Sequence, residues 1–404
     1  MATREFDVIV VGAGMSGATL ACTLGQSEFR VALLDKNPAR VWQQQEYDPR
    51  VSSVNLASQK IVESLGVWQA VQQRRVSPFR NIKVWSDDGS VHFSAAEISQ
   101  THLGHIIENS VVTSALLEAL NSSKNITVLQ PTEIKQLSCD DHGASVVTEE
   151  HGELSANLLV GADGAASRVR EEAGIVKSVR RYEQKAIVAK VHTEKSHAQT
   201  ARQRFLPTGP LAFLPLSDGS CSIVWSCDNE MASSVLALDD TSFMHDLGEA
   251  FEYHLGEIVE TSPRVAFPLA RQDSASYIGM RTALIGDAAH VIHPLAGLGA
   301  NLGITDAACL AQVLNEAHDK NRDIGSHTTL RCYERWRKGD NALVSCAMDM
   351  YKNIFGNSSD TVRRVAGSGL NFANRMSPVK HILMRHATGI SGDLPDIARQ
   401  SSIH

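Results

Sequence analysis

The chain has 404 residues, of which 43% are hydrophobic and 21% are charged, and its formal net charge is −7. This length and composition predict a globular protein with two or more domains, and the negative charge argues against general nucleic-acid binding. The N-terminus contains Glu5 and Asp7 and lacks a basic signal-peptide region, and no apolar run approaches a membrane span. We therefore expect a cytoplasmic protein. The 7 cysteines include no CxxC pair, which argues against a disulfide framework or a zinc site.

The first motif is a glycine-rich turn between two β-prone segments. Phe6–Val11 leads into the turn, a helical pattern continues to Gln26, and Arg30–Leu34 is a second β-like run followed by Asp35. The turn has the form GxGxxG, with its glycines at Gly12, Gly14 and Gly17. In this context the pattern predicts dinucleotide binding, with phosphates at the helix N-terminus and Asp35 on a ribose hydroxyl. The motif does not distinguish FAD from NAD.

Two later stretches place an acid beside glycines after an apolar strand. Asn157–Val160 precedes the loop that contains Asp163, and Thr282–Ile285 precedes Gly286 and Asp287. The first loop alone favours an Asp-Gly turn in which Ser167 caps a short helix. Because the two stretches resemble each other, we interpret both acids as cofactor contacts. Glycines then allow a flat ligand to approach the backbone, and a helix expected to begin near Asn301 directs N–H groups at it.

Two polar features have competing interpretations. Arg50 precedes a helical pattern, and its planar donor fork either reaches the cofactor or pairs with Asp48 at the surface. His102 and His105 lie three residues apart, but no third ligand stands at a convincing spacing. We therefore predict no metal site and favour surface or hydrogen-bonded histidines.

Residues 186 to 267 have a different pattern, in which short β-prone segments alternate with turn residues. These segments are Ala186–His192, Ala201–Phe205, Gly209–Leu216 and Cys221–Cys227. Together with a hairpin signal at Asp87-Asp88-Gly89-Ser90, they predict an antiparallel sheet in a second domain. Large side chains of these strands either line a pocket that faces the cofactor or form plain core. They are Phe205, Phe213, Leu214 and Trp225.

Helical patterns dominate the remainder of the chain. One follows Asp306 to Ala317, a second spans Leu330 to Lys338, and an apolar stripe at helical spacing runs from Leu343 to Phe355. Residues 361 to 386 then contain basic side chains and no acid. This segment either rests on an anionic membrane surface or a partner, or forms helices with solvated basic faces. Its basic residues are Arg363, Arg364, Arg375, Lys380 and Arg385.

Three ordered motifs, GAGMSG, GADGAASRVR and LIGDAAHVIHPLAGLGANLG, resemble the fingerprints of the FAD-dependent aromatic hydroxylases, the group A flavin monooxygenases. Within that superfamily, DPRVS at 48–52, HLGHIIENS at 102–110, AFLPL at 212–216 and MRHATG at 384–389 are similar to the ubiquinone-biosynthesis hydroxylases. The similarity is greatest to the branch that hydroxylates 2-polyprenylphenols at ring C5.

The resemblance implies an α/β fold, with a Rossmann-like FAD-binding domain, an inserted antiparallel-sheet substrate domain and a helical C-terminal region. The expected boundaries are 1–75, 100–180 and 270–340 for the first, 76–99 and 181–269 for the second, and 341–404 for the third. The implied FAD-binding residues are Gly12, Ala13, Gly14, Gly17, Asp35, Lys36, Arg50, Asp163, Gly286, Asp287, Pro294, Gly297, Gly299, Ala300, Asn301 and Leu302. The substrate-pocket candidates are Phe213, Pro215 and Trp225.

The implied reaction is hydroxylation of a polyprenylated phenol by NAD(P)H and O2. Since the chemistry takes place at the flavin C4a position, no catalytic residue is assigned, and His290 and His293 are candidate helpers whose alternative role is to hold the loop. A homo-oligomer, a biosynthetic complex and attachment to the inner face of a membrane are further expectations. Two residues depart from the family pattern: Asp35 replaces a glutamate, and Leu298 replaces a glutamine. A non-oxygenating prenyl-lipid flavoprotein and a non-catalytic lipid-binding scaffold remain alternatives.

Overall fold

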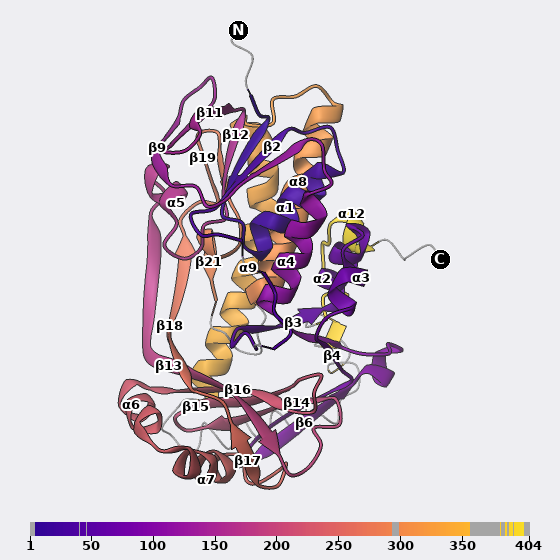
Figure 1. Cartoon of the computed structure of the whole chain (residues 1–404), viewed down its shortest axis with the longest axis vertical. Coiled ribbons are helices and arrows are strands. Elements are labelled where there is room, and N and C mark those ends of the chain that lie inside the picture. Colours follow the sequence, from indigo (N-terminus) through magenta and orange to yellow (C-terminus); the bar gives the residue numbers. More distant parts are fainter. Residues whose placement is uncertain are drawn as a thin grey trace.

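The computed structural model describes residues 5–39, 41–45, 47–292 and 299–355, with the backbone alone from 342 to 355, and also residues 380, 384–385, 388–390 and 392–399. Within these residues the strands form four sheets. Figure 1 shows an upper part built of helices and strands, a lower part built around a broad sheet, and the long strands β13 and β18 running between them.

The upper part is organised around a sheet of six strands in the order β19-β20-β12-β1-β2-β8, called the central sheet below. Its strands are β1 (Val8–Val11), β2 (Val31–Leu34), β8 (Ile126–Leu129), β12 (Leu158–Gly161), β19 (Ile278–Gly279) and β20 (Thr282–Leu284). All pair in parallel except β19, which is antiparallel to β20. The strands β1, β2 and β12 are buried throughout, as expected for a parallel sheet covered on both faces.

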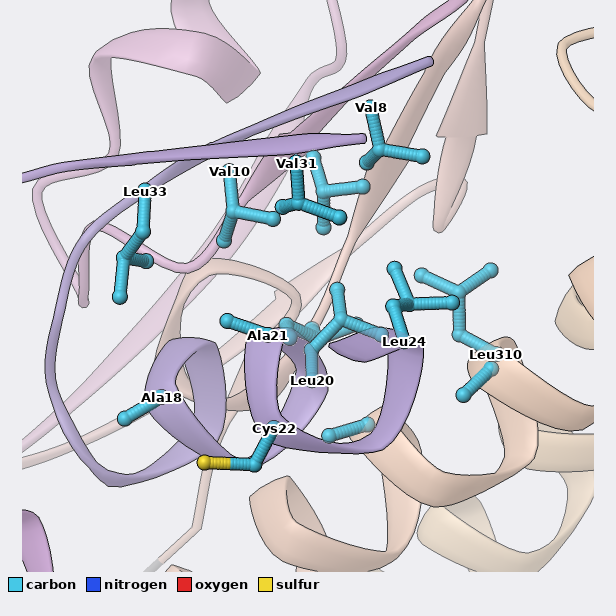
Figure 2. Close-up of a cluster of buried hydrophobic side chains, with 14 of the residues drawn as sticks. Val8, Val10, Ala18, Leu20, Ala21, Cys22, Leu24, Val31, Leu33 and Leu310 are labelled. Carbon is cyan, nitrogen blue, oxygen red and sulfur yellow. The ribbon is translucent and has the colours of Figure 1, made fainter. Parts of the chain in front are cut away.

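Helices α1 (Met15–Gly25), α4 (Asn109–Leu120) and α8 (Gly299–Asp319) pack together in the upper part. Figure 2 shows Val8, Val10 and Leu33 of the sheet directed at Ala21 and Leu24 of α1, with Leu310 of α8 beside them. All of these side chains are buried. The dense apolar packing holds the strand ends, and thus the loops that follow them, in fixed positions.

The lower part is a sheet of nine strands, called the large sheet below, in the order β21-β18-β13-β16-β15-β14-β5-β6 with β17 on β13. Its strands are β5 (Asn81–Ser86), β6 (Gly89–Ser94), β13 (Lys177–Thr193), β14 (Thr200–Leu206), β15 (Gly209–Pro215), β16 (Cys221–Asp228), β17 (Ile258–Thr261), β18 (Val265–Ser274) and β21 (His290–Val291). Apart from the parallel pair of β14 and β5, neighbours are antiparallel. Helices α6 (Asn229–Ala237) and α7 (Asp240–Ala250) supply side chains to one of its apolar cores.

Smaller elements complete the described chain. One three-stranded sheet contains β3 (Val51–Asn55), β4 (Val76–Phe79) and β7 (Gly104–Glu108), and another contains β9 (Ile134–Cys139), β10 (Ala144–Thr148) and β11 (Gly152–Ala156). The other helices are α2 (Leu56–Ser64), α3 (Trp68–Gln72), α5 (Arg168–Glu172), α9 (His327–Phe355) and α12 (Asp396–Arg399). Short 3-10 turns span Ala95–Ile98 and Gly286–Ala288. Among the residues described, no helix has both the length and the apolar character needed to cross a membrane.

The structure differs from the expected elements at several places, and one is β13, which begins at Lys177 rather than at Ala186. Helix α9 continues through residue 341, where a separate C-terminal region was expected to begin, and its Arg337 and Asn341 both bond to Asp306 of α8. Strand β4 pairs with β7 rather than with the large sheet. Residues 76 to 79 therefore lie in the three-stranded sheet of β3, β4 and β7, called the small sheet below. Helices α6 and α7 have no counterpart in the expected pattern.

Candidate functional site

The three glycines of the first turn stand at their positions for different structural reasons. Gly12 has φ +107°, and a Cβ there would lie 2.3 Å from the Ala162 carbonyl oxygen. A Cβ on Gly17 would lie 1.9 Å from the Gly12 carbonyl oxygen. Gly14, in contrast, is exposed and has open space where its Cβ would point. Gly12 and Gly17 are thus needed for close packing, and Gly14 leaves space above the helix N-terminus.

The N-terminus of α1 meets the requirements for binding phosphate. Its N-cap residue, Gly14, makes no side-chain capping bond, and no acid lies in the first turn. A helix leaves its first amides without partners inside the helix, so these N–H groups and the helix dipole favour an anion. Asp35, directly after β2, accepts the Ala13 N–H at 2.8 Å, which places its carboxylate beside the turn. Lys36 is exposed next to it.

A second glycine contact brings the Gly286-Asp287 turn to α1. Gly286 has φ +58°, and a Cβ on it would lie 2.6 Å from the Ser16 Oγ of α1. A Cβ on Gly303 of α8 would lie 2.2 Å from the same oxygen. The turn, α1 and α8 therefore converge at positions where a larger residue would collide. This convergence places Asp287 close to the glycine-rich turn, although the two are far apart in the sequence.

Asp287 and Arg50 lie near one another. The Asp287 side chain has exposed surface, but the surrounding protein removes enough water from its carboxyl group to raise the pKa. The nearby charges of His290 and Arg50 partly oppose this rise in the pKa. The Arg50 guanidinium lies 5.0 Å from the ring centroid of Phe267 on β18. The Asp48 carboxylate accepts the backbone N–H of Arg50 at 2.9 Å. The alternative in which Asp48 pairs with the Arg50 guanidinium is not what the structure shows.

A buried ionic network, which sequence reasoning missed, lies beneath this turn. Asp306 of α8 is fully buried, and its Oδ2 accepts from Gly286 N at 3.1 Å and from His290 Nε2 at 2.6 Å. Its Oδ1 accepts from Arg337 Nε at 2.7 Å and from Asn341 Nδ2 at 3.3 Å. Burial alone would raise the pKa of this carboxyl, but His290 and Arg337 hold it well below its usual range. The network fixes the turn against α8 and α9.

The position of His290 favours its loop-holding role. Its side chain is only 3% exposed, and Nε2 is bonded to Asp306, so it is not directed at an open site. His102 and His105 lie with ring centroids 4.4 Å apart, and the Nε2 of His102 contacts Gln59 Oε1 at 2.8 Å. Within the described part of the chain, no group of three or more metal-ligating side chains comes together.

The Asp163 loop is tied to the Asp287 turn through a buried arginine. Arg170 is 1% exposed and donates to the carbonyl oxygens of Ala165 and Ala288, each at 2.9 Å. Asp163 accepts from Ser167 Oγ at 2.5 Å and from Arg168 N at 2.7 Å, within its own loop. The expected cap is confirmed, since Ser167 Oγ accepts the Arg170 N–H at 3.0 Å. A direct cofactor contact of Asp163 stays a prediction.

Asn301 attaches α8 to β3. Its amide donates to the Ser53 carbonyl oxygen at 2.6 Å and accepts the Asn55 N–H at 2.9 Å. The side chain is therefore occupied, and only its backbone is left for a ligand. Gly299, Ala300 and Leu302 in the same turn are partly exposed. His293, Pro294, Gly297 and Leu298 lie outside the described residues.

The structure does not support the expected pocket role of Phe213 and Trp225. Both are almost completely buried in the core that α6 and α7 share with the large sheet, and Phe213 stacks on Phe251 with ring centroids 3.7 Å apart. Pro215 follows Phe213 by two residues and thus shares its face of β15. The opposite face presents Ala212 and Leu214, which pack in a separate core with Tyr47 and Val51. Strand alternation, which the sequence shows, does not say which face a cofactor domain covers.

The residues present fit FAD. The uncapped N-terminus of α1 and the open space at Gly14 suit a pyrophosphate, and the Asp35 carboxylate suits a ribose hydroxyl. Asp287 and Arg50 provide an acceptor and a planar cation at the next position along the same edge. The fold and this site define a dinucleotide-binding flavoprotein of the α/β class.

Comparison with known proteins agrees with this class. The family described as FAD binding domain matches residues 5–339. A ubiquinone hydroxylase, UbiL, from Rhodospirillum rubrum is 36% identical over 96% of this chain and 90% of its own. The 3-demethoxyubiquinol 3-hydroxylase of Escherichia coli is 33% identical over 96% of this chain and 100% of its own. In fold, p-nitrophenol 4-monooxygenase from Pseudomonas putida is similar with a TM-score of 0.78 at 18% identity, covering 96% of this chain and 98% of that one.

The chain therefore belongs to the FAD binding domain family. Within that family it is an FAD-dependent aromatic-ring monooxygenase, and its curated relatives include hydroxylases of ubiquinone biosynthesis.

Proposed function

We propose that this protein hydroxylates the ring of a polyprenylated phenol in ubiquinone biosynthesis, with NAD(P)H as reductant and O2 as co-substrate. The observation that carries the proposal is the open N-terminus of α1 with Asp35 and Asp287 at the carboxyl edge of the central sheet and Arg50 near Asp287. The pathway is that named for the UbiL and 3-hydroxylase relatives. Bound FAD supplies the oxidation chemistry, and the chain supplies binding, orientation and exclusion of water.

Each part of the edge has a proposed binding role. Gly12, Gly14 and Gly17 with the amides of α1 hold the pyrophosphate, and Asp35 holds the adenosine ribose. Asp287 bonds the ribityl hydroxyls, with Arg50 as the neighbouring cation. The N-terminal turn of α8, from Gly299 to Leu302, directs backbone N–H groups at the flavin ring and stabilises negative charge there. Asp163, in the loop after β12, is the remaining proposed contact to FAD.

The face of the large sheet opposite α6 and α7 suits the substrate ring. By strand alternation this face carries small and apolar side chains near its centre, and Phe267 lies there beneath Arg50. The small and apolar residues are Ala186, Val188, Ala212 and Val224. Such an apolar surface excludes water and suits a prenylated ring. We name no catalytic base, since His290 is bonded to Asp306.

For the ring position we propose C5, on the motifs that this chain shares with the C5 branch. Hydroxylation at another position is the second candidate, because the Escherichia coli relative is named for position 3. The test incubates the purified protein with FAD, NAD(P)H, ¹⁸O2 and a short-chain 2-prenylphenol, then locates the new hydroxyl by NMR and the label by mass spectrometry. Label at C5 supports the proposal, and label elsewhere moves the assignment to that carbon.

Replacement of Asp287 tests the proposed FAD-binding site. Asp287→Ala should lose most bound FAD while the chain remains folded, because the side chain is exposed and, among the residues described, no hydrogen bond or ion pair ties it to the core. Flavin absorbance per protein and circular dichroism measure the two effects. Normal flavin content in the variant would remove Asp287 from the site.

NAD(P)H oxidation with an unlabelled product would indicate the non-oxygenating flavoprotein, and failure of the wild-type chain to bind FAD would indicate the scaffold.

A further inference from the structure

The loop that carries Arg50 is anchored on the side of the small sheet by a buried ion pair. We call residues 42–45 and 47–50, the last part of the connection between β2 and β3, the Arg50 loop. Arg75 pairs with Glu108 at 2.6 Å, and Glu108, only 2% exposed, accepts the Asp48 N–H at 2.7 Å. Arg75 also donates to the Gln43 carbonyl oxygen at 3.3 Å, and its guanidinium lies 4.0 Å from the Tyr47 ring centroid. The upper part thus holds the loop at several points.

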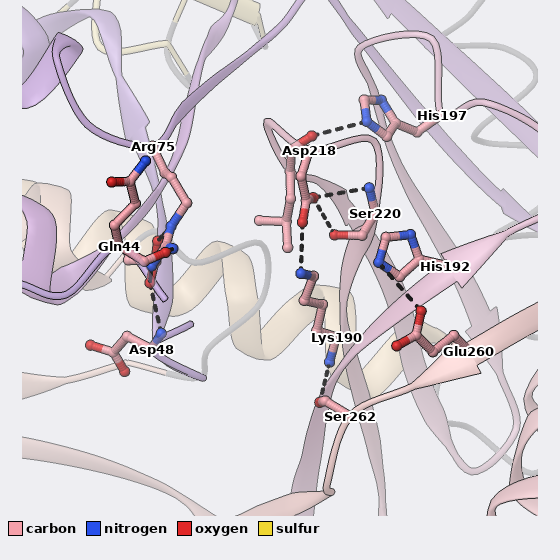
Figure 3. A network of polar contacts seen from close by, with 12 residues as sticks. Gln44, Asp48, Arg75, Lys190, His192, His197, Asp218, Ser220, Glu260 and Ser262 are labelled. Atoms are coloured by element: carbon pink, nitrogen blue, oxygen red, sulfur yellow. Dashed lines mark hydrogen bonds and ion pairs between the residues drawn. The ribbon is translucent and has the colours of Figure 1, made fainter. Parts of the chain in front are cut away.

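A second cation reaches the same tyrosine from the large sheet. The Lys190 ammonium of β13 lies 4.1 Å from the Tyr47 ring centroid and 2.6 Å from Asp218 Oδ2. Figure 3 shows Lys190 directed at Asp218, which Ser220 also contacts. Burial would raise the pKa of Asp218, but hydrogen bonds from Lys190 and Ser220 lower it to about 2. The ionised Asp218 fixes the Lys190 ammonium against the ring.

Tyr47 therefore lies between two cations that belong to different parts of the fold. Such contacts are electrostatic attractions to the ring face, and they strengthen where water is partly removed. Tyr47 packs in the apolar core that the large sheet shares with Val51 and Phe79. Three residues after Tyr47, the Arg50 guanidinium lies over Phe267 and next to Asp287. Asp48 links the two, since its carboxylate accepts the N–H groups of Arg50 and Ser110.

We propose that Lys190 and Tyr47 form a latch between the large sheet and the Arg50 loop, and that Tyr47 is a positioning residue that sets Arg50 at the cofactor site. The inference rests on the proposed function, because Arg50 has a task only if FAD binds beside Asp287. The latch also couples the two parts: a displacement of β13 moves the loop that carries the cofactor-binding arginine.

The test compares variants that remove the cation or the ring with variants that keep them. Lys190→Met removes the charge and keeps most of the apolar stem, and Tyr47→Leu removes the ring, whereas Tyr47→Phe retains it. Lys83→Met is the matched control, because Lys83 lies 5.3 Å from the ring centroid of Trp85, on the other face of the large sheet. Hydrogen–deuterium exchange of the Arg50 loop is measured first, on the purified chain without added FAD.

We expect faster exchange in the Arg50 loop for Lys190→Met and Tyr47→Leu, and unchanged exchange for Tyr47→Phe and Lys83→Met. The dissociation constant for FAD should rise about three- to tenfold in the first two variants, the size of effect expected from losing a partly desolvated cation–ring contact. If Tyr47→Leu does not fold, Lys190→Met still decides the question.

Unchanged loop exchange in Lys190→Met would overturn the latch. Faster exchange with an unaltered FAD dissociation constant would overturn the positioning role of Tyr47. A wild-type chain that binds no FAD would instead overturn the proposed function, and the exchange measurement would still decide the latch by itself.

Discussion

Single residues at the turn after β1 separate packing from ligand binding. Gly17 touches the backbone of Gly12 so closely that no Cβ fits, whereas Gly14 faces open space with φ −69°, a value that any residue adopts. Gly17 is therefore required for the turn to close, whereas Gly14 leaves space for a ligand above the helix N-terminus.

Gly14→Ala should leave the chain folded and weaken FAD binding, because its methyl group enters the space where the pyrophosphate is expected. Gly17→Ala should destabilise the fold by about 1–3 kcal/mol through overpacking. Urea unfolding and FAD titration of both variants measure the two effects. Normal FAD affinity in Gly14→Ala would place the phosphates elsewhere.

His105 of β7 gives the structure a pH dependence. The ring is buried beside Trp68, and burial, with a contribution from His102, lowers its pKa from 6.5 to about 3. Because the unfolded chain binds a proton near pH 6.5 and the folded chain does not, stability is full above that pH. Below it, stability falls by ~1.4 kcal/mol per pH unit until the pH nears the folded pKa.

His105→Leu should therefore lose less stability than the wild type between pH 7 and pH 5, by about 2 kcal/mol. The exposed His151→Leu serves as the control and should follow the wild type. Urea unfolding at both pH values is the measurement. Parallel losses in the wild type and His105→Leu would show that other groups control the acid sensitivity.

At the scale of elements, helices α8 and α9 act as one support for the Asp287 turn. Asp306 and Arg337 pair at 2.7 Å with 0% and 3% side-chain exposure, and Tyr333 Oη donates to the Leu284 carbonyl oxygen at 2.7 Å. The tyrosine joins α9 to β20, the strand before the turn, and the ion pair joins α9 to α8, whose Asp306 also accepts the Gly286 N–H of the turn. A buried pair of this kind costs desolvation, so its value lies in fixing geometry as much as in stability.

Arg337→Met should destabilise the chain by about 3–5 kcal/mol, since it leaves the buried Asp306 carboxylate with fewer compensating charges. Adding Asp306→Asn should recover part of that loss, because the uncompensated charge is removed. A double-mutant cycle by urea unfolding gives the coupling between the two. Additive losses would indicate that the pair is not coupled.

At the scale of the whole molecule, one residue of the basic C-terminal segment has a partner within the protein. Lys380 is 8% exposed and pairs with Glu97 at 2.8 Å, so an acid within the protein neutralises its charge. Met384 packs in the core on the large sheet. Arg363, Arg364 and Arg375 lie outside the described residues. Truncation of the segment would therefore expose core, and charge substitution is the sharper test of membrane attachment.

We expect a variant with Arg363, Arg364 and Arg375 changed to Gln to float less with vesicles that contain anionic phospholipid than the unaltered chain does. Each basic residue near such a surface contributes about 1 kcal/mol at low salt. Lys124→Gln, which removes an exposed basic charge outside this segment, is the control. Equal flotation of all three proteins would remove the membrane hypothesis for this segment.

The sequence by itself determined the class of protein, because the features that define it are local. The GxGxxG turn needs glycines at Gly12 and Gly17 for steric reasons that act within one strand–turn–helix unit, and the cap by Ser167 acts within four residues. Three of the short β-prone segments of the large sheet were predicted close to their observed bounds for the same reason, whereas β13 begins at Lys177, nine residues before the predicted start at Ala186.

Only the tertiary structure decided the partners of side chains that are far apart in the chain. Asp306 with Arg337, Arg170 with Ala288, and Lys190 with Tyr47 are brought together by packing, and no local pattern distinguishes them from solvated charges. The same holds for Phe213 and Trp225: alternation put them on one face, but α6 and α7 cover that face. Burial against a particular neighbour is a property of the folded chain, so it enters only when the elements are assembled.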